Sequence, residues 1–137
     1  MLFRSNPEEI SSYYYPTRNR ELEYDILLIS NAEFLPEFDD YIQFKESTGY
    51  SVAAISVEEI YTIYGGVDQA ELVRNCIIDY YETYNISYVI LGGDTDAQNI
   101  ANVVVPHRGF HVDDDPSLPS DMYFSNLDGS SSTWNPR

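Results

Sequence analysis

Three short apolar runs alternate along the chain with longer stretches that carry one apolar face. The runs cover residues 24–30, 50–56 and 87–91. They are apolar almost throughout and rich in strand-forming residues, which is typical of strands buried in a parallel sheet. Strands that alternate with helices in this way indicate a parallel sheet with helices packed on both of its faces.

The first two stretches between these runs predict helices. One helix is expected over residues 33–48, because apolar residues recur there at roughly helical spacing and Gly49 follows as a terminating glycine. A shorter helix is expected over residues 56–64, where Ser56 and Glu59 have the spacing of a capping box.

A longer helix is expected over residues 68–84. Asp68 and Glu71 form an N-terminal pair, and Asn85 ends the apolar pattern. Cys76, the only cysteine, falls on the apolar face of this helix. A catalytic thiolate needs partial exposure and a nearby base or helix N-terminus, so we expect Cys76 to be an ordinary core residue.

The element order β-α-β-α-β predicts a three-layer α/β/α fold with a small, mostly parallel sheet. Right-handed crossovers favour the strand order 2-1-3 for the three runs. Residues 103–105, all valine, are a candidate fourth strand. The expected sheet therefore has three or four strands.

The remaining segments set the domain organisation. Residues 1–22 are polar and irregular and contain three consecutive tyrosines, so we expect an N-terminal arm. Residues 23–137 are expected to form the α/β subdomain. Beyond Pro106 the turn-forming residues predict loops, with a last extended piece over residues 121–126.

The chain is strongly acidic, with 23 Asp and Glu against 7 Lys and Arg and a net charge of −16. Such a surface repels nucleic acid and anionic membranes and favours cationic partners, cationic substrates or divalent metals, or it is simply a solvated acidic surface.

The 43% hydrophobic content excludes a disordered chain. No apolar run approaches the length of about 20 residues that a membrane span needs. A single cysteine excludes an internal disulfide, and no secretion signal is visible.

Two groups of residues are candidate metal ligands. Asp94 and Asp96 follow the third apolar run, where α/β sheets place ligands, and they could bind calcium with backbone carbonyls; a tight turn with an Asp cap is the alternative. His107 and His111 are four residues apart, a helical metal-ligand spacing, but Pro106 predicts a surface loop there.

Asp121 is the candidate substrate-binding residue. A lone aspartate before an extended segment is often a cap or a solvated residue, and a binding role is the second interpretation. Neither a Walker motif nor a dinucleotide-binding glycine fingerprint occurs in the chain.

The chain resembles the gingipain-type cysteine peptidases over residues 24–137. The similarity lies in an ordered set of segments, namely residues 24–31, 44–45, 49–52, 88–94, 120–124, 127–129 and 134–135. This resemblance implies a caspase-like catalytic domain of two α/β subdomains, of which this chain matches the first.

The resemblance also implies a site. Family members use a histidine–cysteine pair in the second subdomain after a His-Gly segment, whereas here Arg108 follows His107 and Cys76 is helical. The aspartate of the family's Ser-Asp-x-x-Tyr segment, which is Asp121 here, can line the S1 pocket. A carboxylate in that position would pair with a P1 arginine or lysine of a peptide or protein substrate. Acid-rich stretches of the family can hold calcium.

Three hypotheses follow. The first is the N-terminal fragment of a gingipain-like cysteine endopeptidase, which contributes substrate pocket and packing surface to a second subdomain but lacks the catalytic pair. The alternative is a stand-alone acidic α/β binding or interaction module of a surface or secreted protein. A flavodoxin-like domain that binds a small molecule or a metal is the third. Secretion or display at the cell surface follows from the resemblance alone.

Overall fold

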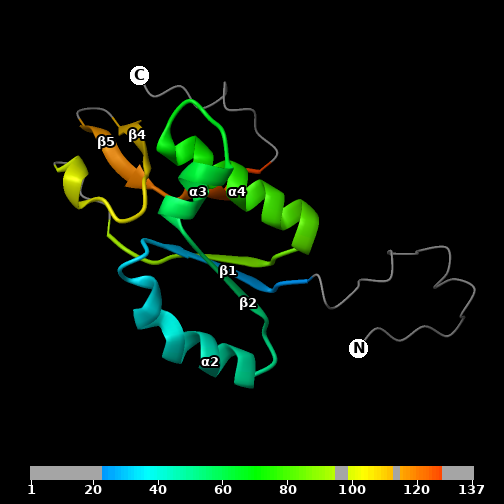
Figure 1. Cartoon of the computed structure of the whole chain (residues 1–137). Helices are drawn as coiled ribbons and strands as arrows, with labels where there is room; N and C mark the ends of the chain where they lie inside the picture. Colours follow the sequence, from blue (N-terminus) through cyan, green and yellow to red (C-terminus); the bar gives the residue numbers. More distant parts are fainter. Residues whose placement is uncertain (1–22, 95–98, 113–114, 128–137) are drawn as a thin grey trace, which may run out of the picture.

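A three-stranded parallel sheet forms the centre of the computed structural model, which describes residues 23–94, 99–112 and 115–127 (Figure 1). The strands are β1 (Ile26–Ser30), β2 (Val52–Ser56) and β3 (Tyr88–Leu91). Their order is β2-β1-β3 and all pairs are parallel, which confirms the predicted topology. Strand β1 is buried along its whole length because strands flank its two edges and helices cover both faces of the sheet, and this position explains its uninterrupted apolar run.

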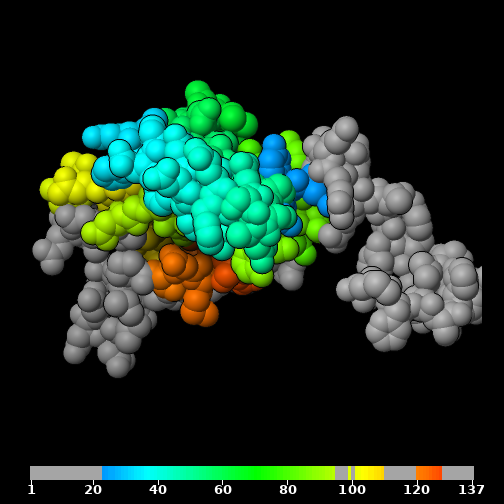
Figure 2. Space-filling model, turned by 90° about the horizontal axis from the view of Figure 1, so that it is seen from below, coloured from blue at the N-terminus to red at the C-terminus, as the bar shows by residue number. Residues whose placement is uncertain are grey.

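Helices cover both faces of this sheet (Figure 1). Helix α2 (Asp39–Ser47) lies on one face, and α3 (Val57–Ile63) and α4 (Gln69–Tyr84) lie on the other, which confirms the α/β/α expectation. Helix α2 contains no buried residue, and Figure 2 shows it spread over the side of the molecule turned toward the viewer. The helix expected over residues 33–48 instead begins with a 3-10 turn, η2 (Leu35–Phe38), at whose start a proline is placed.

The predicted N-terminal caps of α3 and α4 and the predicted end of α4 are confirmed. The Ser56 hydroxyl accepts a hydrogen bond from the Glu59 N–H (3.2 Å), and the Glu59 carboxylate accepts one from the Ser56 N–H (3.0 Å). The backbone bond to Ser56, and then the bond from its hydroxyl, lower the pKa of Glu59. Asp68 accepts from the Glu71 N–H (2.9 Å) at the start of α4, and Asn85 ends that helix in the left-handed conformation.

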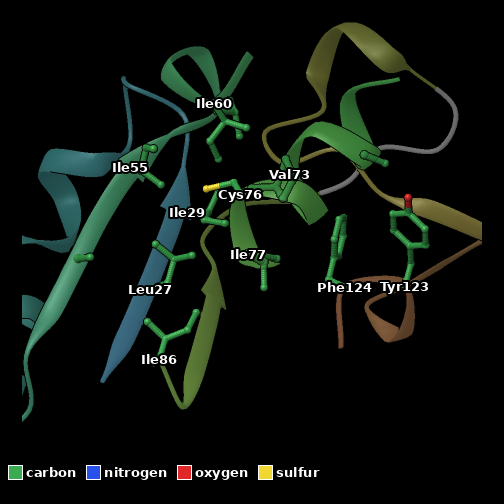
Figure 3. Packing of buried hydrophobic residues seen from close by; sticks show 14 residues of the cluster. Leu27, Ile29, Ile55, Ile60, Val73, Cys76, Ile77, Ile86, Tyr123 and Phe124 are labelled. Carbon is green, nitrogen blue, oxygen red and sulfur yellow. The ribbon is translucent and has the colours of Figure 1, made fainter. Parts of the chain in front are cut away.

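The main core lies between the sheet and helices α3 and α4 (Figure 3). Leu27 and Ile29 of β1 belong to one buried cluster with Cys76 and Ile77 of α4. Cys76 is fully buried, as the helical pattern predicts. Tyr123, from the C-terminal part of the described chain, joins this cluster beyond the sheet (Figure 3).

The segment after Pro106 is not the loop that its turn-forming residues predict. Strands β4 (Arg108–Val112) and β5 (Asp115–Ser120) form an antiparallel hairpin beside the central sheet. Backbone hydrogen bonds define this pairing, and they do not require the alternation of apolar and polar residues that sequence analysis looks for. Gly109 and Pro119 even face each other in the register, which explains why the hairpin is invisible in the sequence.

Two further expectations about the C-terminal half are wrong. Residues 103–105 form no fourth strand: Val104 donates its N–H to the Asp94 carbonyl (3.1 Å) and Val105 is buried in the core, beyond a 3-10 turn, η3 (Ile100–Asn102). The piece over residues 121–126 is not extended but contains the one-turn helix α5 (Met122–Ser125). A strand would point Tyr123 and Phe124 to opposite sides, whereas the helical turn buries both.

The predicted N-terminal arm, residues 1–22, lies outside the described residues. Within the described ranges, no helix has both the length and the apolar character that crossing a membrane requires.

Candidate functional site

The carboxyl ends of the three parallel strands meet at one edge of the sheet. Ser30 ends β1, Ser56 ends β2, and Gly92 directly follows β3. The Ser30 hydroxyl donates a hydrogen bond to the Gly92 carbonyl and so ties the end of β1 to the loop after β3. Ligands of open α/β sheets bind at this edge, so its side chains are the first candidates for a site.

Asp121 lies at the β3 side of this edge. Together with His107 and Phe124, it lines a cavity of about 130 Å³ next to Leu91, the last residue of β3. It also borders a larger groove of about 410 Å³ that runs along β3 and is lined mainly by apolar side chains. Asp121 is exposed, so a carboxylate lies where the small cavity and the apolar groove meet.

The Asp121 side chain does not cap the helix that follows it. The N–H of Met122 donates instead to the hydroxyl of Ser120 (3.2 Å), and Asp121 makes no side-chain cap bond. Only the backbone carbonyl of Asp121 serves the helix, by accepting from the N–H groups of Phe124 (3.0 Å) and Ser125 (3.2 Å). Among the described residues the carboxylate has no hydrogen-bond or ion-pair partner, so it is available to a ligand.

A wider cavity of about 680 Å³ lies over the ends of β1 and β2. Glu58 and Tyr61 of α3 line it, and the Glu58 carboxylate accepts a hydrogen bond from the Ala32 N–H (2.9 Å). Burial, and secondarily the charge of Glu58, raises the pKa of Tyr61 to about 12, so this phenol stays neutral at physiological pH. His107 and Arg108 also line this wider cavity, and His107 separates it from the smaller cavity at Asp121 because it lines both.

The structure describes only part of the candidate metal ligands. Asp94 is exposed after β3, whereas Asp96 lies outside the described residues, so calcium binding by this pair remains a prediction. His107 is half-buried beside the Asp121 cavity, and His111 belongs to strand β4 rather than to a surface loop. No group of three or more His, Cys, Asp or Glu side chains suited to a metal occurs in the part of the chain that the structure describes.

Cys76 has none of the features of a catalytic thiol. Its side chain is fully buried on α4, and burial is the main reason that its pKa rises to about 12, against the lowering effect of a hydrogen bond with Tyr64. Asp79 adds a further, smaller increase. The reactive thiolate is therefore nearly absent at neutral pH.

We expect Cys76 to react with Ellman's reagent at pH 8 about 1000-fold more slowly in the folded chain than in urea. The physical reason is that folding raises the thiol pKa from 9.0 to about 12, and the thiolate fraction at pH 8 falls by the same ratio. Stopped-flow absorbance of the folded and the denatured chain measures both rates. Equal rates in the two states would contradict the buried position of this side chain.

The sequence analysis missed the residues that hold the Asp121 segment. Tyr123 is fully buried, and the guanidinium groups of Arg74 and Arg108 lie 5.5 and 4.5 Å from its ring centre. Arg108 in turn pairs with Asp68. Only the aromatic pair at positions 123 and 124 signalled a core contact here, because its partner Arg108 is 15 residues away and the Arg74–Asn126 and Arg108–Asp68 contacts span 52 and 40 residues.

Comparison with known proteins gives a family. The family model described as peptidase family C25 matches residues 19–135, which is most of the chain. No curated protein and no solved structure matches the chain. The family match includes the three strands, the helices and the segment that carries Asp121, and it confirms the resemblance seen in the sequence. The chain therefore belongs to peptidase family C25, the gingipain family.

Proposed function

We propose that this chain is the N-terminal subdomain of a gingipain-like cysteine endopeptidase and forms one wall of its substrate pocket. Family membership supports the peptidase class. The observation that carries the assignment of a pocket wall is the Asp121 carboxylate, exposed at the carboxyl edge of the sheet and free of any role as a cap.

The chemistry of this position suits a cationic P1 side chain. The apolar groove beside Asp121 includes Val89, Leu91 and Phe124, which can pack against the aliphatic part of an arginine or lysine. The carboxylate would then receive the cationic head group in a charge-assisted pair, and a second subdomain that covers the pocket would strengthen this pair by excluding water.

The nucleophile and the general base would come from the second subdomain. Cys76 is buried with a raised pKa, and His107 is followed by Arg108 rather than by glycine. Neither residue fits the paired thiol and imidazole that cysteine peptidases need. The second subdomain is thus the main proposed partner, and secretion or cell-surface display is proposed from family membership alone.

The isolated chain is expected to show no hydrolysis of fluorogenic arginyl or lysyl peptide amides. The Cys76→Ser variant should give the same background signal as the unmodified chain, because a buried thiol contributes no nucleophile. Turnover that requires a thiol and disappears with Cys76→Ser would overturn the proposal that catalysis belongs to another part of the enzyme.

The reading frame that encodes this chain separates the proposal from an acidic binding module. A continuation past Arg137 that encodes a His-Gly segment and a cysteine after a strand, and whose product cleaves the same amides, supports the peptidase. A stop codon at that point supports the binding module, for which the strongly negative net charge would be the main recognition feature.

A further inference from the structure

Arg108 connects three elements around the Asp121 segment. Its guanidinium forms a two-pronged contact with Asp68 at the start of α4, with Nη1–Oδ2 and Nη2–Oδ1 distances of 3.0 Å. The same Nη2 donates to the Tyr123 hydroxyl (3.2 Å), and the guanidinium lies 4.5 Å from the centre of the Tyr123 ring. The Arg108 side chain is only 16% exposed, whereas Asp68 is 45% exposed, so the guanidinium is largely buried on its Tyr123 side and reaches solvent at the ion pair.

Arg74 of α4 holds the C-terminal end of the short helix α5, which contains Tyr123. Its Nη2 donates to the Asn126 carbonyl (2.7 Å), just after α5, and its guanidinium lies 5.5 Å from the Tyr123 ring centre. A cation at the C-terminus of a helix satisfies carbonyl groups that have no partner within the helix. Helix α5 is therefore held by two guanidinium groups, one at its aromatic side chain and one at the carbonyl of Asn126, the residue that follows it.

The strand register extends this support to the residue before Asp121. Arg108 is the direct partner of Ser120 in the β4–β5 pairing. Asp121 thus has Arg108 contacts on both sides in the sequence: backbone pairing at Ser120 and side-chain contacts at Tyr123. We infer that Arg108, assisted by Arg74, is a positioning residue that fixes the direction of the Asp121 carboxylate toward the proposed P1 cation.

The local structure needs such support. A single helical turn is unstable by itself, because nucleation costs more than one turn of hydrogen bonds returns. The described ranges of this very acidic chain contain only three Lys and Arg residues, and two of them contact Tyr123. The third, Lys45, lies 5.6 and 5.3 Å from the rings of Tyr41 and Tyr50 near α2 and provides a matched control.

The test uses the full chain and two variants that break the contact from opposite sides. Arg108→Gln removes the guanidinium. Asp68→Asn removes the ion pair but keeps a side-chain oxygen for the N-terminus of α4, so it tests the contact even where Arg108→Gln folds poorly. Lys45→Gln removes the other aromatic-bound cation and serves as control.

The first measurement is hydrogen exchange, resolved by NMR, at the amides of Phe124 and Ser125, which donate to the Asp121 carbonyl. We expect exchange about 10-fold faster in Arg108→Gln and about threefold faster in Asp68→Asn, with no change in Lys45→Gln, because the contacts of a largely buried guanidinium limit local opening. Unchanged exchange in both Arg108→Gln and Asp68→Asn would overturn the inference.

The second measurement separates positioning from general stability. The inference rests on the proposed function, in which Asp121 binds a cationic P1 side chain. The ligands are therefore Nα-acetyl-arginine amide and its uncharged analogue Nα-acetyl-citrulline amide, and their affinities are measured by NMR titration. The preference for arginine should fall about threefold or more in Arg108→Gln, partly recover in Arg108→Lys, and stay unchanged in Lys45→Gln. If Arg108→Gln prefers the arginine ligand over the citrulline ligand as strongly as the unmodified chain does, Arg108 does not position the Asp121 carboxylate.

The two failures are distinguishable. If Asp121→Asn binds both ligands as the unmodified chain does, Asp121 has no role in recognising a cation and the proposed function fails. The exchange rates then still decide whether Arg108 holds the Asp121 segment in place. Faster exchange with an intact arginine preference would leave Arg108 as a purely structural residue and overturn its positioning role.

Discussion

Asp121→Asn is expected to lower kcat/KM of the proposed full-length endopeptidase for arginyl and lysyl substrates. The decrease should correspond to a loss of about 2–5 kcal/mol of transition-state binding free energy. The physical reason is that a water-excluded carboxylate loses its charge while the substrate cation remains buried opposite it. Substrates with an uncharged P1 residue should lose much less. The ratio of kcat/KM for arginyl and uncharged substrates measures this effect directly.

The Asp40→Asn variant is the matched control for this experiment. It removes the same charge from an exposed position in the first turn of α2, on the opposite face of the sheet, so it tests whether net charge alone changes the ratio. Its ratio should equal that of the unmodified enzyme. An unchanged ratio in Asp121→Asn would remove this residue from the substrate pocket. A ratio changed equally in both variants would assign the effect to net charge.

Asp121→Ala, which unlike Asp121→Asn removes any capping oxygen, should leave the stability of the fold nearly unchanged. A capping aspartate would cost about 1 kcal/mol when replaced by a residue that cannot cap, but the hydroxyl of Ser120 already accepts the helix N–H. Selectivity and stability are therefore expected to respond to different residues, which distinguishes a binding carboxylate from a cap.

Leu27→Ala is expected to cost about 2–5 kcal/mol of the free energy of unfolding. Leu27 lies on the central strand, is fully buried, and belongs to the cluster between the sheet and α4. Truncation leaves a cavity that rigid neighbours on the sheet and the helix cannot fill, so the loss includes a cavity contribution beyond the transfer of the methyl groups. Urea denaturation followed by circular dichroism measures it.

Val89→Ala supplies the comparison within the same row of the sheet. Val89 is the register partner of Leu27 on the edge strand β3 and is 37% exposed. Its truncation should cost no more than about 1 kcal/mol, because exposed positions bury less surface to lose. Similar losses for the two variants would place β3 in the interior of a larger sheet in solution.

The sequence predicted the βαβαβ half of this protein because its signals are local. An uninterrupted apolar run identified β1, and the pairing of Ser56 with Glu59 located the start of α3, three residues away along the chain. Cys76 was correctly placed in the core by the period of α4. In each case the residues that cause the structure are close in sequence. They either form one buried face of a helix or strand or accept a hydrogen bond from a helix N–H a few residues away.

The C-terminal half could not be predicted because its determinants leave no local side-chain pattern. The hairpin of β4 and β5 depends on backbone pairing, and α5 depends on guanidinium groups from Arg74 and Arg108. The valines at 103–105 have the composition of a strand, but they follow β3 without strand pairing, and the Val105 side chain is buried in the core. Local propensity favoured strand and loop there, and tertiary contacts decided otherwise.

For the candidate site, the sequence by itself determined which residue to examine and the tertiary structure decided what that residue can do. Asp121 stood out through the similarity of its segment to the gingipain family. Whether its carboxylate caps a helix or faces a cavity depended on Ser120, which takes over the cap, and on Arg108, whose partner Asp68 is 40 residues away. A sequence pattern records neighbours along the chain, whereas the availability of a carboxylate depends on neighbours in space.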